Sequence, residues 1–432
     1  MSNPRDTSRC AAVLRRLYSL HRLGIKPGLG RIKRLLAALG DPQTAYRSIH
    51  VAGTNGKGST SAILHSILSE RYTTGLYTSP HLQRFNERIR VGRALIKDTE
   101  VVRLAVKVEA AARRAGVRGL TFFEFTTAMA FLYFRDRGVE AAVLETGMGG
   151  RWDATNTVTP LVSVITNVGL DHKEFLGHDI KSVAAEKAGI IKKSVPVVTG
   201  ADKKDALGVI ISEARKKGSR LSVLGRDFDV VPAANGRFGY RGPVWRLRGL
   251  SVGLRGAHQL KNAASALAAL ESVSGSLNVT EDEIRRGLAG VLWPGRVEVL
   301  NRRPLVVLDS AHNPEGAVTL KEALGSFRYS RLILVIGVMA DKDIEGIFSV
   351  LLPLADSVIF AAPDTERAAG AAVLLQKAAP YGKKASVAAS VKDACRAALK
   401  EARPADAVCC AGSIFTVGEA RGYLKRVLGK GI

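Results

Sequence analysis

Cysteine, aromatic side chains and long apolar runs are all scarce in this sequence. Four scattered cysteines in 432 residues are too few for a disulfide framework, and none has the spacing of metal ligands. The longest apolar stretch, residues 332–340, is well short of the roughly 18 residues that a membrane span needs. The first ten residues have no apolar core, unlike a secretory signal. We therefore expect a protein of the reducing cytoplasm that has no membrane partner.

Acidic residues are also in deficit. Lysine and arginine number 64 against 39 for aspartate and glutamate, which gives a net charge of +25. Such an excess suits an anionic substrate or a nucleic acid. The basic residues, however, are spread along the chain without a long block, and aromatic residues make up only 6%. These patterns favour a generally positive surface that is compatible with an anionic substrate, and we expect no nucleic acid partner.

The composition and the order of the apolar segments predict a globular α/β protein. Hydrophobic residues make up 46% of the chain, and its length suggests two or three domains. A strand at residues 48–52, a glycine-rich turn and a helix over residues 57–70 form a βα unit, which predicts a parallel sheet. Short β-like runs between residues 221 and 254 predict a small antiparallel addition. Further buried strands are expected at residues 141–144, 161–165 and 195–198.

A boundary between two domains is expected at residues 293–296, where the sequence reads WPGR. Five βα units in the last roughly 130 residues predict a smaller, doubly wound, Rossmann-like domain. Their strands are expected at residues 305–308, 332–336, 357–360, 385–387 and 408–411. We therefore divide the chain into domains at residues 1–296 and 297–432.

The strongest local motif is the glycine-rich segment Gly53–Thr60, between the first strand and its helix. Glycines let backbone N–H groups approach phosphate oxygens, the helix N-terminus adds partial positive charge, and Lys57 adds a full one. The spacing departs from the common GxxxxGK[ST] motif, because Val51 replaces the first glycine and Gly58 replaces the hydroxyl residue after the lysine. A nucleotide-bound metal would need a ligand from elsewhere. The alternative is a plain connecting turn.

Polar residues follow several predicted strands, at the edge where open α/β sheets bind ligands. Glu145 can hold Mg²⁺ through its carboxylate, or it can cap the glycine-rich turn that follows it. His172 can ligate a metal, position phosphate or play a structural role. Asp309 begins the segment DSAHNP, where it can act in the site or cap the next helix. The loop Thr78–Leu82 offers a hydroxyl that can supply the missing metal ligand, unless it is a surface turn.

In this order, the motifs resemble the folylpolyglutamate synthase and dihydrofolate synthase family of the Mur ligase superfamily. The resemblance runs from residue 53 to residue 419 and is more specific than any single motif. Its departures are Trp152 for the commoner leucine and Ser310 for the commoner glycine or alanine. The matching stretches are GTNGKGS (53–59), TSPHL (78–82), FNERIR (85–90), ETGMGGRWDATN (145–156), DH…LG (171–177), EKAGI (186–190), HQLKNA (258–263), PGR (294–296), DSAHNP (309–314), DKD (341–343) and GSIFTVGE (412–419).

The resemblance implies an ATP-dependent amide ligase. A P-loop-containing, Mur-ligase-like N-terminal domain would bind ATP and the pterin, and the C-terminal domain would supply the glutamate site. The substrates would be ATP, L-glutamate and either dihydropteroate or a reduced folate, and the enzyme would be a monomer. The γ-phosphoryl group of ATP would pass to the substrate carboxylate, and the glutamate amine would attack the acyl phosphate. Lys57 and two Mg²⁺ ions would neutralise the charges that meet in this step.

The resemblance also implies which residues hold the nucleotide and the metals. The phosphates would lie against Thr54, Asn55, Gly56, Lys57, Gly58 and Ser59. Other nucleotide contacts would come from Asn262, Arg296 and Asp309. The metal ligands would be Ser79, Glu145, His172 and Lys187, the last as a carbamylated lysine. The catalytic set would be Lys57, Glu145, His172, Lys187 and His312.

The two remaining substrates are assigned in the same way. A phenylalanine at position 122 or 123 can stack on the pterin ring, and Asp153 can hydrogen-bond its polar edge. The incoming glutamate would lie near His312 and Ser413. The pteroate contacts would be Thr121, Phe122, Phe123, Glu124, Trp152, Asp153 and Ala154.

Two other functions compete with that of a folate ligase. A Mur-type ligase that adds an amino acid to a cell-wall nucleotide precursor would share the phosphate loop and the metal carboxylate, but the stretches TSPHL, FNERIR and RWDATN favour folate. A basic, nucleotide-dependent nucleic-acid-binding protein would need a clustered positive face and salt-dependent affinity. The sequence shows neither a nucleic-acid module nor an aromatic stacking array.

Overall fold

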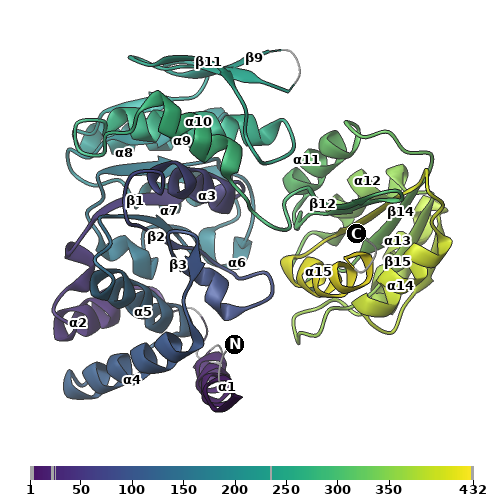
Figure 1. Cartoon of the computed structure of the whole chain (residues 1–432), viewed down its shortest axis with the longest axis horizontal. Coiled ribbons are helices and arrows are strands. Elements are labelled where there is room, and N and C mark those ends of the chain that lie inside the picture. Colours follow the sequence, from purple (N-terminus) through teal and green to yellow (C-terminus); the bar gives the residue numbers. More distant parts are fainter. Residues whose placement is uncertain (1–3, 21–23, 25, 234–235, 430–432) are drawn as a thin grey trace. The chain divides into compact units, whose positions relative to one another are not determined.

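The computed structural model describes residues 4–20, 24, 26–233 and 236–429, in two compact units. Each unit has its own β-sheet and its own apolar core (Figure 1). The N-terminal unit comprises Met1–Pro80, Phe85–Gly253 and Leu260–Val291. The C-terminal unit comprises His81–Arg84, Leu254–Gln259 and Leu292–Ile432.

The N-terminal unit is built on an eight-stranded sheet in the order β4-β3-β2-β5-β1-β6-β7-β8. Strands β2, β5, β1, β6, β7 and β8 are parallel, as predicted, whereas β3 and β4 form an antiparallel edge. Val51 pairs with Glu145, so β1 and β5 end side by side. The strands are β1 Arg47–Ala52, β2 Thr74–Tyr77, β3 Ile89–Val91, β4 Ala94–Leu95, β5 Ala141–Glu145, β6 Val162–Ile165, β7 Val197–Thr199 and β8 Leu221–Val223.

Amphipathic helices cover this sheet. Ala142 and Leu144, alternate residues of β5, pack in one core with apolar side chains of α1, α2, α4 and α5. The helices are α1 Pro4–Ser19, α2 Gly30–Ala38, α3 Lys57–Leu68, α4 Asp98–Arg114, α5 Phe122–Asp136, α6 Lys173–Leu176, α7 Ile180–Ala188, α8 Lys204–Lys216, α9 His258–Ser272 and α10 Glu281–Gly290. The short 3₁₀ helices are η2 Pro42–Thr44, η3 Phe85–Arg88 and η4 Ala154–Thr157.

The predicted antiparallel addition is confirmed for residues 229–250, which form a separate three-stranded sheet, but the prediction was wrong for residues 221–223, which form β8 of the parallel sheet. The strands of the three-stranded sheet are β9 Asp229–Pro232, β10 Phe238–Arg241 and β11 Arg246–Leu250, in the order β11-β10-β9. Glu271 of α9 attaches it to the rest of the unit, because its buried carboxylate accepts hydrogen bonds of 2.6 Å from the hydroxyl of Tyr240 and from the N–H of Val244. A charged acceptor with several donors is a strong anchor.

The C-terminal unit is a doubly wound α/β domain, as predicted. Its six-stranded sheet has the order β12-β13-β17-β14-β15-β16, and all neighbouring strands except β12 and β13 are parallel. The strands are β12 Glu298–Arg302, β13 Leu305–Leu308, β14 Leu332–Ile336, β15 Ser357–Phe360, β16 Lys384–Val387 and β17 Ala407–Ala411. The helices are α11 Pro314–Leu324, α12 Ile344–Leu351, α13 Ala371–Ala378, α14 Val391–Glu401 and α15 Ile414–Leu428, with 3₁₀ helices η5 Leu352–Leu354 and η6 Ala379–Tyr381.

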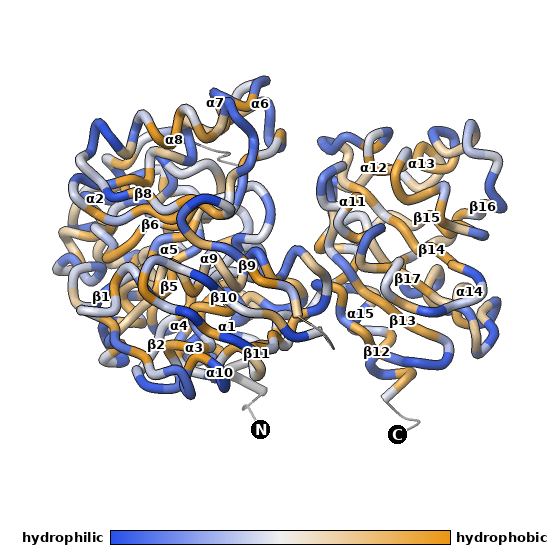
Figure 2. Tube along the Cα trace, turned by 90° about the horizontal axis from the view of Figure 1, so that it is seen from above, coloured by the Kyte–Doolittle hydropathy of each residue, from blue (hydrophilic) through white to orange (hydrophobic). Residues whose placement is uncertain are grey.

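The central strands of this sheet are buried on both faces. Leu305 and Val307 of β13 face one core, whereas Val306 and Leu308 face the other. Continuous apolar runs are typical of such strands, and β13 and β14 consist of apolar residues throughout (Figure 2). Helices on both faces therefore fix the sheet, and the loops after its strands are held on a rigid base.

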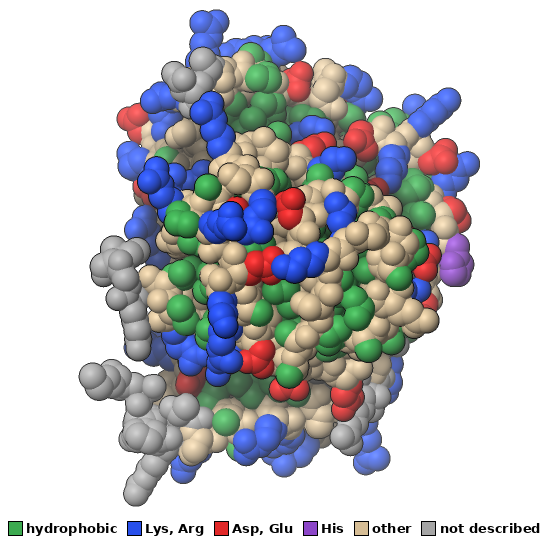
Figure 3. All heavy atoms as spheres, turned by 90° about the vertical axis from the view of Figure 1, so that its right-hand side faces the viewer, with side chains coloured by type: hydrophobic (Ala, Val, Ile, Leu, Met, Phe, Trp, Pro, Cys, Tyr) green, Lys and Arg blue, Asp and Glu red, His purple; other side chains and the backbone are tan. Residues whose placement is uncertain are grey.

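Charged side chains are distributed over the surface. On the face that Figure 3 shows, lysine and arginine lie among acidic and apolar side chains. Within the described residues, no helix combines the length and the apolarity needed to cross a bilayer.

Candidate active site

The phosphate loop connects β1 to α3 and requires glycine at two positions. Gly53 has a φ of 155° and Gly56 a φ of 81°, in the region that side chains disfavour. A Cβ atom on Gly53 would overlap with Oγ1 of Thr166, and one on Gly56 would lie 2.6 Å from Oδ1 of Asn262. The loop is therefore tightly enclosed, and Asn262 lies beside it.

The two halves of this loop have different backbone environments. In the first half, the N–H groups of Thr54 and Asn55 donate to Oδ1 of Asn167, at 3.1 and 2.8 Å. In the second half, α3 begins at Lys57 without a side-chain cap. The first N–H groups of a helix have no partner within the helix and carry partial positive charge, so they suit a bound anion. The loop thus has an anchored first half and an anion-binding helix terminus.

Two lysine side chains converge on the carbonyl oxygen of Gly53. Nζ of Lys57 lies 3.0 Å from this oxygen and 3.1 Å from that of Thr54, and Nζ of Lys187, on α7, lies 2.9 Å from the Gly53 oxygen. Burial, and then the charge of Lys57, lower the pKa of the Lys187 amine to about 7, although Asp171 opposes the shift. Lys57 therefore supplies positive charge at the loop, where a polyanion would be stabilised, whereas the buried Lys187 loses its proton more easily than an ordinary lysine.

Glu145 ends β5 beside this loop. Its side chain is buried, and Oε2 accepts a hydrogen bond of 3.1 Å from the backbone N–H of Ser79. The structure thus brings two predicted metal ligands together. A carboxylate next to a hydroxyl residue fits Mg²⁺, which prefers oxygen ligands and keeps waters or substrate phosphates in its shell. Within the described residues, no three side chains of His, Cys, Asp or Glu are grouped closely enough to hold a metal.

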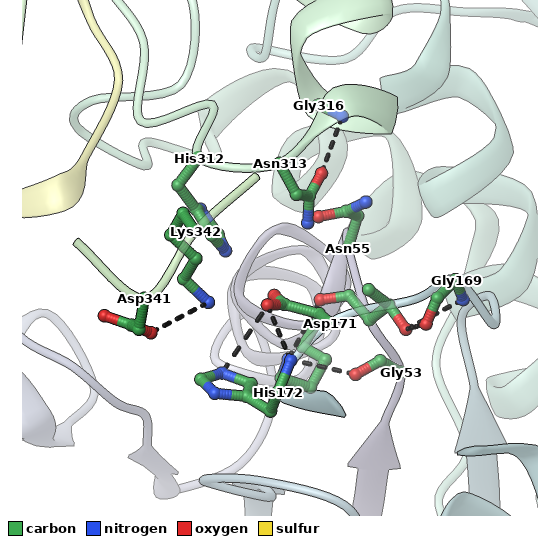
Figure 4. Close-up of polar contacts among 12 residues, drawn as sticks. Gly53, Asn55, Gly169, Asp171, His172, His312, Asn313, Gly316, Asp341 and Lys342 are labelled. Atoms are coloured by element: carbon green, nitrogen blue, oxygen red, sulfur yellow. Dashed lines mark hydrogen bonds and ion pairs between the residues drawn. The ribbon is translucent and has the colours of Figure 1, made fainter. Parts of the chain in front are cut away.

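His172 lies in the segment that follows β6, next to Asp171. Its φ is 50°, its N–H donates to Oδ1 of Asp171 at 2.9 Å, and its Nε2 lies 4.0 Å from Oδ2. Figure 4 shows this pair close to Gly53. The charge of Asp171 also acts on Lys187. His172, Asp171 and Lys187 thus form a second group of polar side chains at the edge of the sheet where the phosphate loop lies.

Thr121 and Glu124 have structural roles at the start of α5. They form a capping box, in which Oγ1 of Thr121 accepts the N–H of Glu124 at 3.2 Å and Oε2 of Glu124 accepts the N–H of Thr121 at 2.9 Å. Glu124 is buried and also forms an ion pair of 3.1 Å with Nε of Arg31. A pteroate contact of either residue would have to coexist with these bonds.

The two phenylalanines of α5 have different surroundings. Phe122 is buried in the core, with its ring centroid 5.6 Å from that of Tyr18. Phe123 is only partly buried and stacks on Tyr77, with centroids 5.9 Å apart. A Cβ atom on Gly147 would lie 2.7 Å from Cζ of Phe123, so this ring lies against the loop that follows β5. Of the two predicted rings, Phe123 is the better placed for a ligand at the sheet edge.

Asp153 lies inside the loop that follows β5. Its Oδ2 accepts the N–H of Met148 at 3.0 Å, and its Oδ1 accepts the N–H and the hydroxyl of Thr155 at 3.0 and 2.5 Å. Burial raises the pKa of this carboxyl group, and the hydrogen bonds oppose that effect. Trp152, next to it, is 52% exposed, whereas Ala154 is buried.

In the C-terminal unit, Asp309 anchors the turn after β13. Its buried carboxylate accepts the N–H groups of Val297 at 2.8 Å and Ala311 at 2.9 Å. Burial raises the pKa of this carboxyl group, and the charge of Arg296 opposes the shift. Asp309 and Arg296, two of the predicted nucleotide contacts, therefore lie in one electrostatic group.

The predicted glutamate contacts lie after β13 and β17, neighbouring strands of the same unit. Nδ1 of His312 lies 2.9 Å from the carbonyl oxygen of Ser310, and Asn313 caps α11 (Figure 4). Oγ of Ser413 accepts the N–H of Thr416 at 3.0 Å and so caps α15. Ser413 therefore has a structural role in addition to the one predicted for it.

Comparison with known proteins decides the family. The middle domain of Mur ligases matches residues 51–270, and their glutamate ligase domain matches residues 295–414. The folylpolyglutamate synthase of Lacticaseibacillus casei is 42% identical over 76% of this chain and 79% of its own length. The dihydrofolate synthase/folylpolyglutamate synthase of Escherichia coli is 36% identical over 96% of this chain and 95% of its own length. The chain belongs to the folylpolyglutamate synthase and dihydrofolate synthase family of Mur ligases.

Solved structures of folylpolyglutamate synthases share the fold of this one. Escherichia coli FolC in complex with DHPP and ADP has a TM-score of 0.89 and 33% identity, covering 96% of this chain and 98% of that one. The Mycobacterium tuberculosis enzyme complexed with ADP and AMPPCP has a TM-score of 0.90 and 33% identity, covering 96% and 99%. The Yersinia pestis enzyme complexed with AMPPNP and Mn has a TM-score of 0.88 and 32% identity, covering 98% and 100%. The predicted fold class and the prediction of an ATP-dependent ligase are confirmed.

Several residues that shape the site of this ligase were missed in the sequence. Asn167 anchors the phosphate loop, the hydroxyl of Thr166 donates to the carbonyl of Asn55 at 2.6 Å, and Arg31 pairs with Glu124. Thr166 and Asn167 directly follow a buried strand, and that position was the available signal. Arg31 gave no signal, because it lies on a separate amphipathic helix.

Replacement of Gly56 by alanine should impair nucleotide binding by this enzyme. The positive φ and the contact with Asn262 both oppose a Cβ atom, at a cost of about 1–3 kcal/mol in folding stability. We expect ATP affinity, measured by calorimetry, to fall at least about tenfold. Gly218→Ala is the matched control, because Gly218 has a φ of 62° but no atom near its Cβ position. Wild-type ATP affinity in Gly56→Ala would contradict this role of the loop.

Proposed function

We propose that this ATP-dependent ligase joins L-glutamate to dihydropteroate, to the glutamyl tail of reduced folates, or to both, through an acyl phosphate. One observation carries the chemistry: the ammonium group of Lys57 lies at the carbonyl of Gly53, where α3 begins and beside the sheet edge where Glu145 ends its strand. ATP and the acceptor carboxylate are both anions, so a reaction between them needs concentrated positive charge.

In the proposed reaction, Lys57 and the first turn of α3 hold the terminal phosphates of ATP. Glu145 and Ser79 would hold Mg²⁺, which supplies charge neutralisation on the phosphate oxygens. The acceptor carboxylate attacks the γ-phosphorus, ADP leaves, and the glutamate amine then displaces phosphate from the acyl carbon. Water must be kept from the acyl phosphate during this reaction, because it would otherwise hydrolyse the intermediate.

The remaining site residues are assigned to the two domains of the chain. We propose residues 1–296 as the domain that binds ATP and pterin, with Asn262 at the nucleotide and with Phe123 and Asp153 at the pterin. Residues 297–432 would be the glutamate-ligase domain. Arg296, at the boundary between the two domains, and Asp309, after β13, would contact the nucleotide, and His312 and Ser413 would contact the glutamate. A monomer suffices for this chemistry, because one chain carries all the proposed residues.

We also propose that Lys187 is carbamylated. Carbon dioxide adds to an uncharged amine with loss of one proton, and burial of Lys187 favours that uncharged form. The product is an anionic oxygen ligand, which would complement a second Mg²⁺ near His172. In the structure the amine donates to the carbonyl of Gly53, and the carbamate nitrogen would keep one N–H that can still make this bond.

Lys187→Ala is expected to lower the ligase rate at least about 100-fold, and a short carboxylate such as acetate should restore part of it by replacing the lost anion. The check is steady-state ADP release with and without acetate. Lys192→Ala serves as the control, because Lys192 is a partly buried lysine that donates to Asn156 instead. No carbamate signal in ¹³C NMR after addition of labelled bicarbonate, together with no rescue, would contradict carbamylation.

The proposed function is tested by glutamate-dependent phosphate release with different acceptors. Dihydropteroate and tetrahydrofolate should be offered separately, with a UDP-linked cell-wall precursor as the competing acceptor. We expect release with at least one of the two pterins and none with the nucleotide precursor. Release only with the precursor would overturn the proposal in favour of the other Mur-type ligase.

A further inference from the structure

A chain of buried hydrogen bonds connects β1 to the loop that follows β5. Nε2 of His50, on β1, lies 2.8 Å from Oγ1 of Thr155, and this hydroxyl lies 2.5 Å from Oδ1 of Asp153. Oδ2 of Asp153 accepts the N–H of Met148 at 3.0 Å. His50, Thr155 and Asp153 are all buried, at 0%, 0% and 7% exposure. These hydrogen bonds therefore connect the core of the sheet to the backbone of the loop that follows β5, at Met148.

The direction of each bond in this chain is fixed. An ionised Asp153 only accepts, so the hydroxyl of Thr155 donates its one proton to Oδ1. Oγ1 of Thr155 must then accept from His50, whose proton lies on Nε2. Burial, and then the charge of Lys192, lower the pKa of His50 to about 3, so the imidazole is neutral and keeps this tautomer at physiological pH.

The geometry points to His50 and Thr155 as positioning residues for the pterin end of the acceptor, acting through the carboxylate of Asp153. This inference rests on the proposed function. Asp153 accepts the N–H of Met148, so the position of its carboxylate helps to hold the loop after β5 at that residue. Phe123 lies against Gly147 of the same loop. A shift of the carboxylate would therefore disturb both candidate pterin contacts together.

The phosphate loop should be affected much less. His50 precedes Gly53 by three residues, but the loop is anchored separately by Asn167 and by Thr166. Loss of a hydrogen bond between His50, Thr155 and Asp153 should thus raise the KM for the pterin acceptor and leave the KM for ATP nearly unchanged. A general loss of stability would instead reduce the active fraction of the enzyme and lower the apparent kcat for every substrate.

The test compares variants that remove one link with variants that keep it. Thr155→Val and His50→Leu each remove a hydrogen-bonding group, and we expect the KM for dihydropteroate or tetrahydrofolate to rise about 10- to 100-fold, as for a hydrogen bond to a charged group. Thr155→Ser and His50→Gln keep a hydroxyl and an Nε2 donor, and should restore most of the affinity. Thr199→Val is the control, because its buried hydroxyl donates to the carbonyl of Ile165 and accepts from the N–H of Ala201, both backbone groups outside this chain of hydrogen bonds.

A double-mutant cycle with Asp153→Asn shows whether the effect passes through the carboxylate. The KM of the double variant Thr155→Val/Asp153→Asn should be no higher than that of Asp153→Asn alone. Additive losses, an unchanged acceptor KM, or equal rises in both KM values would overturn the inference. If Thr155→Val does not fold, the comparison of His50→Leu with His50→Gln decides by the same criteria. Failure of wild-type enzyme to use any pterin would instead refute the proposed function.

Discussion

Lys57→Ala is expected to reduce ATP-dependent ligation about 1,000-fold or more while the protein remains folded. Lys57 is the one full charge that the phosphate loop itself carries, and its ammonium group already lies at the loop carbonyls of Gly53 and Thr54. A preorganised positive charge stabilises the phosphoryl group during transfer, and such a charge is commonly worth about 1,000-fold or more in rate. Steady-state ADP release, with thermal unfolding measured in parallel, checks both parts of this expectation.

Two further variants make this experiment specific. Lys57→Arg keeps the charge but not its compact geometry, so partial activity is expected. Lys216→Ala removes an exposed lysine at the end of α8 and should leave the rate unchanged. Full glutamate-dependent ADP release by Lys57→Ala would contradict the assignment of the loop.

Glu145→Gln should cause the second large loss, again about 1,000-fold, at low Mg²⁺ concentration. The change removes a negative charge but keeps the size of the side chain and an oxygen that can accept from the N–H of Ser79. The fold should therefore remain, while a neutral amide holds a divalent cation much less strongly than a carboxylate does. A titration of activity against Mg²⁺ should show half-saturation at a higher concentration than in the wild type.

Glu140→Gln is the matched control for this titration. Glu140 immediately precedes the same strand, at its opposite end, and accepts the N–H of Thr73 at 2.8 Å. It should keep the wild-type dependence on Mg²⁺. If Glu145→Gln also kept the wild-type dependence, the carboxylate would have no metal-binding role.

Most of the fold could be predicted because the apolar pattern is strong where the sheet is buried. Runs such as LILVI, in β14, are buried on every residue, and their sequence shows this directly. The strand β12 was missed, because an edge strand with polar residues such as Glu298 and Asn301 has no apolar run. The short hairpin of β3 and β4 was missed for a similar reason, since it has only five residues in two strands.

The candidate site was harder to predict because its contacts connect distant parts of the chain. Asn167 reaches Asn55 across 112 positions and Arg31 reaches Glu124 across 93, and no local pattern encodes either pair. A polar side chain at a strand end can either cap the following helix or bind a ligand. The sequence alone does not distinguish these two roles. Ser413, a cap in the structure and a predicted glutamate contact, is an example.

Oxygen isotope transfer tests the central claim most directly. The acceptor carboxylate is labelled with ¹⁸O, and the enzyme converts it to product with ATP and glutamate in unlabelled water. If the carboxylate attacks the γ-phosphorus, one labelled oxygen per turnover appears in inorganic phosphate, and ³¹P NMR detects it. Label in AMP, or unlabelled phosphate alongside amide formation, would contradict an acyl phosphate intermediate at this site.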